Sequence, residues 1–420
     1  MTQRVLLSAY QCGPAMGSVS QIGWEWYSRL SARARVTLVT HIRNRPALER
    51  AGAPLHDSEI VFIDTEWFAG PLFRTARLLF PRSEHAVFLL ASLDFYVYDA
   101  KALRTLRKMP GPWDVCHAVT PVSPLAATRL YRLGPPLITG PWNGGLSSPS
   151  AFAEVMRNDS GWVYRIRNLG KLADRWIGCT RNARLILSAN RATDEAVPLA
   201  ARSKIRRMIE NGVDLSVFHN GSWDPAPSDA VPLRVLFVGR LIPAKGIPFL
   251  LEAVSRVRNE VNLHVTIVGD GPSRSDTEAQ IASLDLSSLV TMTGNLPLPE
   301  VSAQMQSAHL FCLPSVRESG GAVLIEAMAC GVPVVAVNYG GPAEVVDDEV
   351  GRLLPADGPE ALVGVLTQTL RDAARNPEEW RARGQVGRLR AEQRYGWDAK
   401  IGEALEIYRP MSGPKEETVA

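Results

Sequence analysis

Two cations follow an apolar segment in the second half of the sequence, at a spacing that suits anion binding. The segment VLFVG ends at Gly239, Arg240 follows directly, and Lys245 stands five residues later, before the apolar run IPFLLEAV. In open α/β sheets, ligands bind at the carboxyl ends of the strands, where helix N-termini and basic side chains hold phosphate groups. The pattern predicts a phosphate or diphosphate site, although two solvated loop cations would show the same loose spacing.

Two carboxylates follow a second apolar segment, in PSVRESGGAVLIEAMACG. Glu318 precedes Gly320 and Gly321, whose lack of a side chain lets backbone amides approach a ligand closely. Glu326 lies one turn into a helix expected over 322–329, in an apolar stretch where a carboxylate is costly unless it bonds a polar group such as a ribose hydroxyl. Glu318 alone would equally fit a role at the helix N-terminus.

Parallel strands are needed to position these residues, and apolar runs alternate with helical patterns along most of the chain. In the first half the expected strands are RVLLSAY, RVTLVT, EIVFID, DVCHAVTP, PLITGPWNG and WIGCT, and in the second half LRVLFVGRL, LHVTIVGDG, VTMTGNL, HLFCLPS and PVVAVNYG. This alternation is typical of parallel sheets with crossover helices. A stretch rich in turn residues at 192–232 separates the halves, so we expect two doubly wound α/β domains facing each other across a cleft.

Composition indicates a soluble globular enzyme, with 46% hydrophobic and 21% charged residues. The five cysteines are odd in number and never paired at metal-ligand spacing, which argues against disulfides and zinc and favours a reducing cytoplasm. The N-terminus has too few apolar residues for a signal peptide, and no run reaches the ~18 apolar residues that a membrane span needs.

Charge is distributed unevenly between the two halves of the chain. Residues 1–205 carry 26 Lys and Arg against 15 Asp and Glu, a net charge of +11, whereas residues 206–420 carry 20 against 28, a net charge of −8. The basic half is expected to meet an anionic partner such as a membrane surface or a phosphorylated acceptor, and a merely solvated face would fit equally. No nucleic acid partner is expected.

The sequence resembles glycosyltransferase family 4, whose members have the GT-B fold of two Rossmann-like domains. The markers are VGRLIPAKG, VGDGP, the stretch ESGGAVLIEAMACGVPVVA with two glutamates eight residues apart, and GGPAEVVDDEVGRLLP. The resemblance implies an acceptor-binding domain at 1–205, a donor-binding domain at 206–395, and a C-terminal helix and tail at 396–420 that crosses back to the first domain.

The resemblance also assigns roles to individual residues. Arg240 and Lys245 would neutralise the donor diphosphate, Glu326 would hold the ribose, and Glu318 would hold hydroxyls of the transferred sugar. His117 matches a cleft histidine that contacts the donor sugar, although a lone histidine in such a strand is more often structural. Further donor-binding positions are Gly17, Gly239, Gly294, Asn295, Gly320, Gly321, Ala322 and Val323.

Two departures from the family pattern bear on the donor site. The family's first acidic motif continues with a small residue, an aromatic residue and glycine, whereas here Glu318 is followed by Ser-Gly-Gly, which is expected to alter the sugar pocket. The N-terminal loop QCGPAMGSVSQIG also lacks the family's double glycine. Gly13 and Gly17 therefore match the family's phosphate-binding loop less well than the residues of the second half match their motifs.

The resemblance implies transfer from a UDP- or GDP-linked sugar with retention of anomeric configuration, by front-face displacement without an enzyme nucleophile or a metal. No paired glycosidase carboxylates, activated serine or acidic metal motif stands in the sequence. The expected acceptor is lipid-linked or a saccharide, in polysaccharide, lipopolysaccharide or glycolipid assembly. Basic and aromatic residues at 67–109 and 162–176 suggest peripheral contact with the inner membrane face, and amphipathic core helices would give the same pattern.

Four other functions remain compatible with some of these features. A sugar-nucleotide 2-epimerase or a glycan phosphorylase would share the fold, and a small soluble metabolite would be an alternative acceptor. A dinucleotide-dependent oxidoreductase fits less well, because no strand leads into a G-x-G-x-x-G motif with an acid ~20 residues later. A non-catalytic sugar-binding protein is the alternative from a different class.

Overall fold

The chain divides into two compact units in the computed structural model, which describes residues 2–80, 87, 92–111, 113–144, 146, 149–154 and 173–411. Unit 1 consists of Met1–Gly145, Asp159–Glu210 and Lys400–Ala420. Unit 2 consists of Leu146–Asn158 and Asn211–Ala399. In the described part of the chain, no helix is both long and apolar enough to cross a membrane.

The units change a few residues later than the predicted boundaries at 205 and 395. Glu210 is buried within unit 1, where its carboxylate accepts a hydrogen bond of 2.5 Å from the Asn143 amide. Val213 pairs with Gly396 in unit 2, and its backbone N–H donates to the carbonyl of Tyr395 at 2.9 Å. These bonds hold 206–210 in unit 1 and 396–399 in unit 2.

A short internal segment also belongs to unit 2, although it lies inside the range predicted for the first domain. The rings of Phe152 and Phe249 meet edge to face with centroids 5.7 Å apart. Phe152 therefore packs against a side chain of unit 2 that lies about a hundred residues later in the chain. Its placement depends on tertiary packing that no local pattern reveals.

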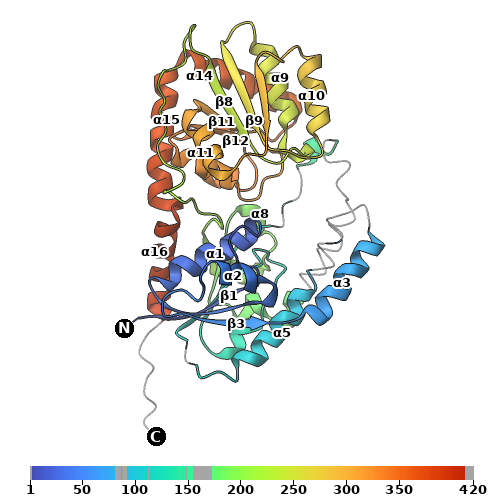
Figure 1. Cartoon of the computed structure of the whole chain (residues 1–420), viewed down its shortest axis with the longest axis vertical. Helices are drawn as coiled ribbons and strands as arrows, with labels where there is room; N and C mark the ends of the chain where they lie inside the picture. The colour runs from blue at the N-terminus through green and yellow to red at the C-terminus, as the bar shows by residue number, and fades with distance from the viewer. Residues whose placement is uncertain are drawn as a thin grey trace. The chain divides into compact units, whose positions relative to one another are not determined.

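Unit 1 contains a sheet of seven parallel strands in the order β3-β2-β1-β4-β5-β6-β7. The strands are β1 (Arg4–Ala9), β2 (Arg35–His41), β3 (Glu59–Ile63), β4 (Val115–Thr120), β5 (Leu137–Trp142), β6 (Leu185–Ser188) and β7 (Ile205–Arg207). Its helices include α1 (Ser18–Ser31), α2 (Arg45–Arg50), α3 (Glu66–Leu79), α5 (Asp94–Leu106), α7 (Cys179–Asn182) and α8 (Arg191–Asp194), and most of α16 (Trp397–Tyr408). Figure 1 labels α1, α2, α3, α5, α8, α16, β1 and β3 among them, and its colours follow the order along the chain.

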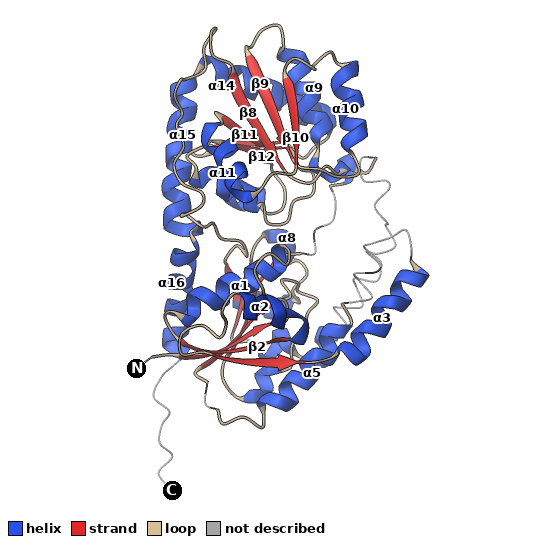
Figure 2. Cartoon of the chain, viewed as in Figure 1, coloured by secondary structure: helices blue, strands red, loops and turns tan. Residues whose placement is uncertain are grey.

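Unit 2 contains a sheet of six parallel strands in the order β10-β9-β8-β11-β12-β13. The strands are β8 (Leu233–Val238), β9 (Leu263–Val268), β10 (Val290–Gly294), β11 (Leu310–Leu313), β12 (Val334–Val337) and β13 (Gly351–Leu354). Its helices are α9 (Ile247–Val257), α10 (Arg274–Ser283), α11 (Leu298–Ser307), α12 (Ala322–Ala329), α13 (Pro342–Val345), α14 (Pro359–Arg375) and α15 (Pro377–Arg390). Figure 2 shows helices on both sides of this sheet, the layered arrangement of a doubly wound fold.

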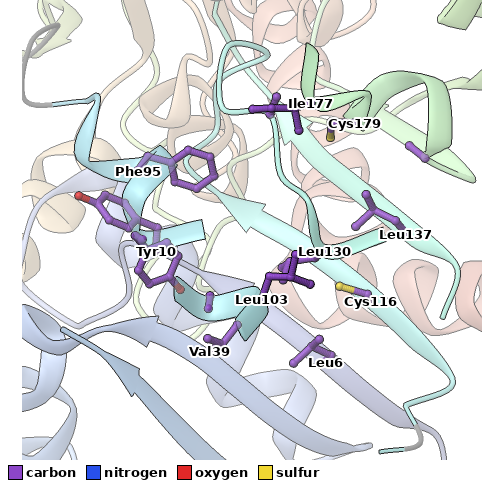
Figure 3. Close-up of a cluster of buried hydrophobic side chains, with 14 of the residues drawn as sticks. Leu6, Tyr10, Val39, Phe95, Leu103, Cys116, Leu130, Leu137, Ile177 and Cys179 are labelled. Carbon is purple, nitrogen blue, oxygen red and sulfur yellow. The ribbon is translucent and has the colours of Figure 1, made fainter. Parts of the chain in front are cut away.

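The cores of both units consist of apolar strands and the helix faces packed on them. In unit 1 one cluster joins side chains from β1, β2, β4 and β5 to those of α5, and Figure 3 shows Leu6, Leu103 and Cys116 among them. In unit 2, Trp380 is fully buried on α15, and its indole N–H donates to Asp372 at 2.9 Å. Trp397 is buried as well.

One predicted strand is wrong. The segment WIGCT forms the end of one helical turn and the start of α7, and the strand at this point in the order is β6, at 185–188. Gly178 adopts a left-handed conformation with φ of 80°, and Asp174 accepts hydrogen bonds from the backbone and hydroxyl of Thr180. An acidic side chain that accepts hydrogen bonds at the start of a helix stabilises the helical turn there, so this apolar segment forms a turn of helix in place of a strand.

Candidate functional site

The predicted cations and carboxylates of the second half meet at the point where the strand order of unit 2 reverses. The chain runs from β8 outward to β9 and β10, then returns to β11 on the other side of β8. The loops after β8 and β11 therefore leave the same edge of the sheet from neighbouring strands. This switch point is where open α/β sheets hold their ligands.

The loop after β8 is fastened directly to the loop after β11. The backbone N–H of Val316 donates to the carbonyl of Ala244 at 2.9 Å, and the Ser315 hydroxyl donates to the same carbonyl at 3.1 Å. Gly246 has φ of 68°, and a Cβ there would stand 2.0 Å from the carbonyl oxygen of Pro314. Only glycine allows this approach, so the residue after Lys245 sets the distance between the two loops.

Lys245 and Glu318 form an ion pair across this junction. Lys245 ends a short 3-10 helix, Pro243–Lys245, and its ammonium donates to Oε2 of Glu318. The other carboxylate oxygen, Oε1, accepts from the backbone N–H of Gly321 at 3.3 Å, just before α12 begins. An ammonium has three N–H donors, so Lys245 keeps donors for a second anionic partner while it holds Glu318.

Arg240 presents a cation beside this pair. Its side chain is exposed, and it directly follows Gly239 at the end of β8. Among the residues that the structure describes, no carboxylate forms an ion pair with its guanidinium. Arg240 and Lys245 thus supply positive charge on one loop at the switch point, as the sequence predicted.

Glu326 stands on α12, which runs from Ala322 to Ala329 as predicted. Its side chain is half-buried, and desolvation raises the pKa of its carboxyl group to about 7. Within the described part of the chain, no hydrogen bond or ion pair reaches this carboxylate. A carboxyl group in such surroundings is stabilised by any ligand that donates hydroxyl hydrogen bonds to it.

The backbone of α12 adds donors at the same place. Gly321 precedes the helix with φ of 64°, and the N–H groups of Ala322 and Val323 belong to the first helical turn, where no carbonyl four residues earlier can accept from them. Gly320 precedes Gly321 in the loop between β11 and α12. The helix N-terminus therefore offers amides and a partial positive charge to an anionic or hydroxyl-bearing ligand.

Gly294 and Asn295 lie farther along the same sheet edge. Gly294 ends β10, which is separated from β8 by β9, and its carbonyl accepts from the N–H of Gly269 at 2.8 Å. Asn295 is exposed. The structure thus places these two residues at the edge that carries the cations, two strands away from them.

His117 has a different environment from the one predicted. It lies on β4 in unit 1, fully buried, with its ring edge-to-face against Trp26. Because the Gly140 carbonyl can only accept, Nε2 carries the proton and donates to it at 2.7 Å, and Nδ1 accepts from the Tyr408 hydroxyl at 2.5 Å. Neither nitrogen is left for a sugar, so the geometry corrects the predicted donor contact to a structural role that joins α16 to the sheet.

Gly17 immediately precedes α1, in the loop that follows β1 of unit 1. It is exposed and has φ of 104°. β1 and β4 are neighbours at which the strand order of unit 1 reverses, so Gly17 stands at this unit's own switch point. Its predicted role in donor binding stays a prediction.

A buried polar network at the strand ends of unit 1 was missed from the sequence. Asp94 accepts from the hydroxyls of Tyr10 and Thr65, both at 2.7 Å, and from Arg43 at 3.1 Å. His41 shares a 2.8 Å bond with Thr65, and burial lowers the pKa of its imidazole to about 4. The residues of this network come from four separate segments of the sequence, so no short motif predicts it.

Unit 1 also holds a cavity of about 340 Å³. Its wall combines Trp142 at the end of β5 with the buried carboxylate of Asp174 and the guanidinium of Arg202. The remaining lining residues are Pro124, Thr180, Glu195, Ala196, Val197, Pro198 and Leu199. A mixed apolar and charged wall of this kind suits a small polar ligand.

No group of three or more His, Cys, Asp or Glu side chains that could bind a metal ion stands among the described residues. The five cysteines are all buried and free of disulfides.

Comparisons with known proteins agree with this arrangement. The family described as "Glycosyl transferases group 1" matches residues 226–386, which include both loops of the switch point. An MMP alpha-(1->4)-mannosyltransferase of Mycolicibacterium hassiacum is 32% identical over 326 residues, covering 74% of this chain and 74% of that protein. A D-inositol 3-phosphate glycosyltransferase of Segniliparus rotundus is 35% identical over 215 residues, covering 48% of this chain and 46% of that protein, so the chain spans about half of this second relative.

Solved structures share the fold over nearly the whole chain. Anabaena HepE, solved in complex with UDP and glucose, has a TM-score of 0.61 at 18% identity, with 97% of this chain and 100% of that chain covered. At this identity the likeness concerns the fold. The chain is a glycosyltransferase enzyme that belongs to the group 1 family and has the two-domain GT-B fold.

Proposed function

We propose that the enzyme transfers a sugar from a nucleoside diphosphate donor, UDP- or GDP-linked, to a hydroxyl acceptor with retention of configuration. The observation that carries this proposal is the ion pair of Lys245 and Glu318 at the switch point, beside the exposed Arg240 and the half-buried Glu326. Cations for a diphosphate and carboxylates for hydroxyls stand together there. HepE, which shares the fold, was solved with UDP bound, which favours a nucleotide donor here as well.

Each side chain has a definite task in this proposal. Arg240 and Lys245 stabilise the negative charge that grows on the departing diphosphate. Glu318, held by Lys245, accepts hydrogen bonds from hydroxyls of the transferred sugar. Glu326 accepts from the ribose hydroxyls, which also stabilises its ionised form.

The bond changes balance without an enzyme nucleophile or a resident metal. The acceptor oxygen forms a bond to the anomeric carbon while the bond from that carbon to the diphosphate oxygen breaks. The acceptor's proton passes to the departing diphosphate oxygen. Attack from the face on which the diphosphate leaves retains the anomeric configuration.

The acceptor is proposed to be lipid-linked or a saccharide, in polysaccharide, lipopolysaccharide or glycolipid assembly. The cavity of unit 1, with Trp142, Asp174 and Arg202 in its wall, is large enough for a sugar ring and combines the side-chain types that bind one. We place the enzyme in the cytoplasm in this proposal, and the net charge of +11 over residues 1–205 favours its peripheral contact with the inner membrane face.

A donor panel tests the proposal. Purified protein is incubated with UDP-, GDP- and ADP-sugars, and thermal stabilisation and slow donor hydrolysis are recorded for wild type, Lys245→Ala and Glu326→Ala. Stabilisation by one nucleotide class that both variants lose supports the donor site. Equal behaviour of all three proteins with every donor would overturn it and would favour the binding-protein alternative.

A further inference from the structure

Helix α3 exposes large apolar side chains on the face that points away from unit 1. Of its fourteen residues, only Ala69 and Ala76 are buried, and they stand seven positions apart on one narrow stripe. Trp67 is 68% exposed and Leu78 is 82% exposed. Figure 1 shows α3 beside α5, beyond the edge of the sheet at which β3 lies.

Helical geometry places these exposed residues opposite the buried stripe. Residues 67, 71, 74 and 78 are separated by four, three and four positions, so they share one face of the helix. At 100° per residue, this face lies about 180° from the face of Ala69 and Ala76. An ordinary surface helix has charged and polar residues there, whereas α3 has a tryptophan, a proline, an arginine and a leucine.

The charge of this surface is positive. Arg74 lies between Trp67 and Leu78 on the outward face, and the Arg77 guanidinium lies 5.6 Å from the ring centre of Phe73. Glu66, the only acidic residue of α3, is paired with Arg43 at 3.0 Å. Interfacial helices combine tryptophan and leucine that enter the acyl boundary with arginines that meet anionic headgroups.

We propose that the outward face of α3 binds the surface of an anionic lipid bilayer and holds the enzyme there. This inference names the surface for the membrane contact proposed above, and it does not require the transfer reaction to occur. The positive charge of this surface favours a bilayer over a second copy of the chain as its binding partner. An isologous dimer through this face would bring the Arg74 side chains of two copies onto one patch, with Arg77 on its flank. Like charges oppose such a contact, whereas anionic lipids complement them.

Vesicle sedimentation tests this proposal with the full chain. The probes are vesicles of phosphatidylglycerol and phosphatidylcholine in equal parts, and vesicles of phosphatidylcholine alone. The variant Trp67→Glu/Leu78→Glu changes two outward side chains, and Leu298→Glu/Leu389→Glu makes the same charge change at two exposed leucines of unit 2. Because all four side chains are exposed, the variants are expected to melt at the wild-type temperature.

Wild type and the unit 2 variant are expected to bind the anionic vesicles, and binding should weaken as salt rises. The α3 variant is expected to bind roughly tenfold more weakly or worse. Equal binding by both variants, or no binding by wild type, would overturn the proposal. So would a wild-type dimer that the α3 variant converts to a monomer in sedimentation velocity, since that would assign the face to a second copy.

Donor hydrolysis in solution separates this proposal from the proposed function. The α3 variant should hydrolyse its donor at the wild-type rate in the absence of vesicles. Vesicle binding by a protein that hydrolyses no donor would uphold the surface and refute the transfer.

Discussion

Lys245 and Glu318 stand 73 residues apart in the chain and form an ion pair across the switch point of unit 2. The pair joins a loop residue expected to meet phosphate to one expected to meet sugar hydroxyls. Its side chains are largely buried, with 20% and 14% of their surfaces exposed. The two predicted subsites are therefore one connected structure, and a change in either partner should affect both.

The connection predicts non-additive effects on catalysis. Lys245→Ala is expected to lower kcat by roughly 10²- to 10³-fold, because one charge on the departing diphosphate loses its partner. Glu318→Gln should lower kcat as well, and the double variant should lose less than the product of the two effects, because the residues are in contact. Initial rates of donor turnover measure all three. A double loss equal to that product would contradict the coupling, and Arg375→Ala on α14 is the control for removal of a cation away from the switch point.

Glu326 predicts proton release when the donor binds. Burial raises the pKa of its carboxyl group to about 7, so a substantial fraction is protonated at neutral pH. Ribose hydroxyls would stabilise the carboxylate and lower this pKa, so the affinity of the protein for the donor should fall as the pH drops from 8 to 6. Calorimetric titrations at pH 7 in two buffers of different ionisation enthalpy measure the released protons. Glu326→Gln should release none, and a wild-type titration without proton release would refute the assignment.

Removal of the Glu326 carboxyl group is expected to stabilise the folded protein at high pH. The folded protein binds a proton more tightly than the unfolded chain, with a pKa of about 7 against 4.5, so the free energy of unfolding falls as pH rises through this window. Glu326→Gln removes the cost of ionisation and is expected to raise the melting temperature at pH 8 but not at pH 4. Thermal melts at both values decide this, and a variant that melts lower at pH 8 would show that the carboxylate stabilises the fold.

His117 predicts a loss of stability in acid. Burial lowers the pKa of its imidazole to about 4, against 6.5 in the unfolded chain, so the unfolded chain takes up a proton first as pH falls. Stability is thus complete above pH 6.5 and declines between 6.5 and 4. His117→Gln should lose about 1–3 kcal/mol at pH 7.5 through its two bonds and should show a shallower decline below 6.5. Urea unfolding across this range tests both, and an unchanged variant would contradict the structural role.

Trp380 predicts a packing contribution in unit 2. Trp380→Ala should destabilise this unit by about 3–5 kcal/mol, because the side chain is fully buried. Trp380→Phe should keep most of the packing and lose about 1 kcal/mol with the hydrogen bond to Asp372. Urea titration followed by circular dichroism measures both. Equal losses in the two variants would show that the hydrogen bond, not the ring, stabilises the unit.

The sequence predicted where the cations and carboxylates of unit 2 stand, because its signals there are local. Arg240 and Lys245 follow a strand directly, and Glu326 is conspicuous as a charge within an apolar helix. The strand before each loop determines which edge these residues occupy, so their neighbourhood could be inferred without tertiary detail. The ion pair of Lys245 with Glu318 could not, since it depends on the side-by-side placement of β8 and β11.

The prediction failed where tertiary partners decide the outcome. The apolar letters of WIGCT suited a strand, but Asp174 bonds to Thr180 and starts a helix there. His117 matched a ligand position by motif, yet its two nitrogens bond to Gly140 and to Tyr408, the latter 291 residues away. The network around Asp94 likewise joins segments whose proximity only the folded sheet provides.

Calorimetric binding of UDP and GDP to wild type, Lys245→Ala and Arg375→Ala tests the central claim most directly, because it asks whether the β8 and β11 loops hold a diphosphate. Wild type and Arg375→Ala should bind one of the two nucleotides with equal affinity, and Lys245→Ala should bind it at least roughly tenfold more weakly, as expected for a lost charge-assisted contact to phosphate. Binding of the nucleotide by Lys245→Ala with wild-type affinity would contradict the account.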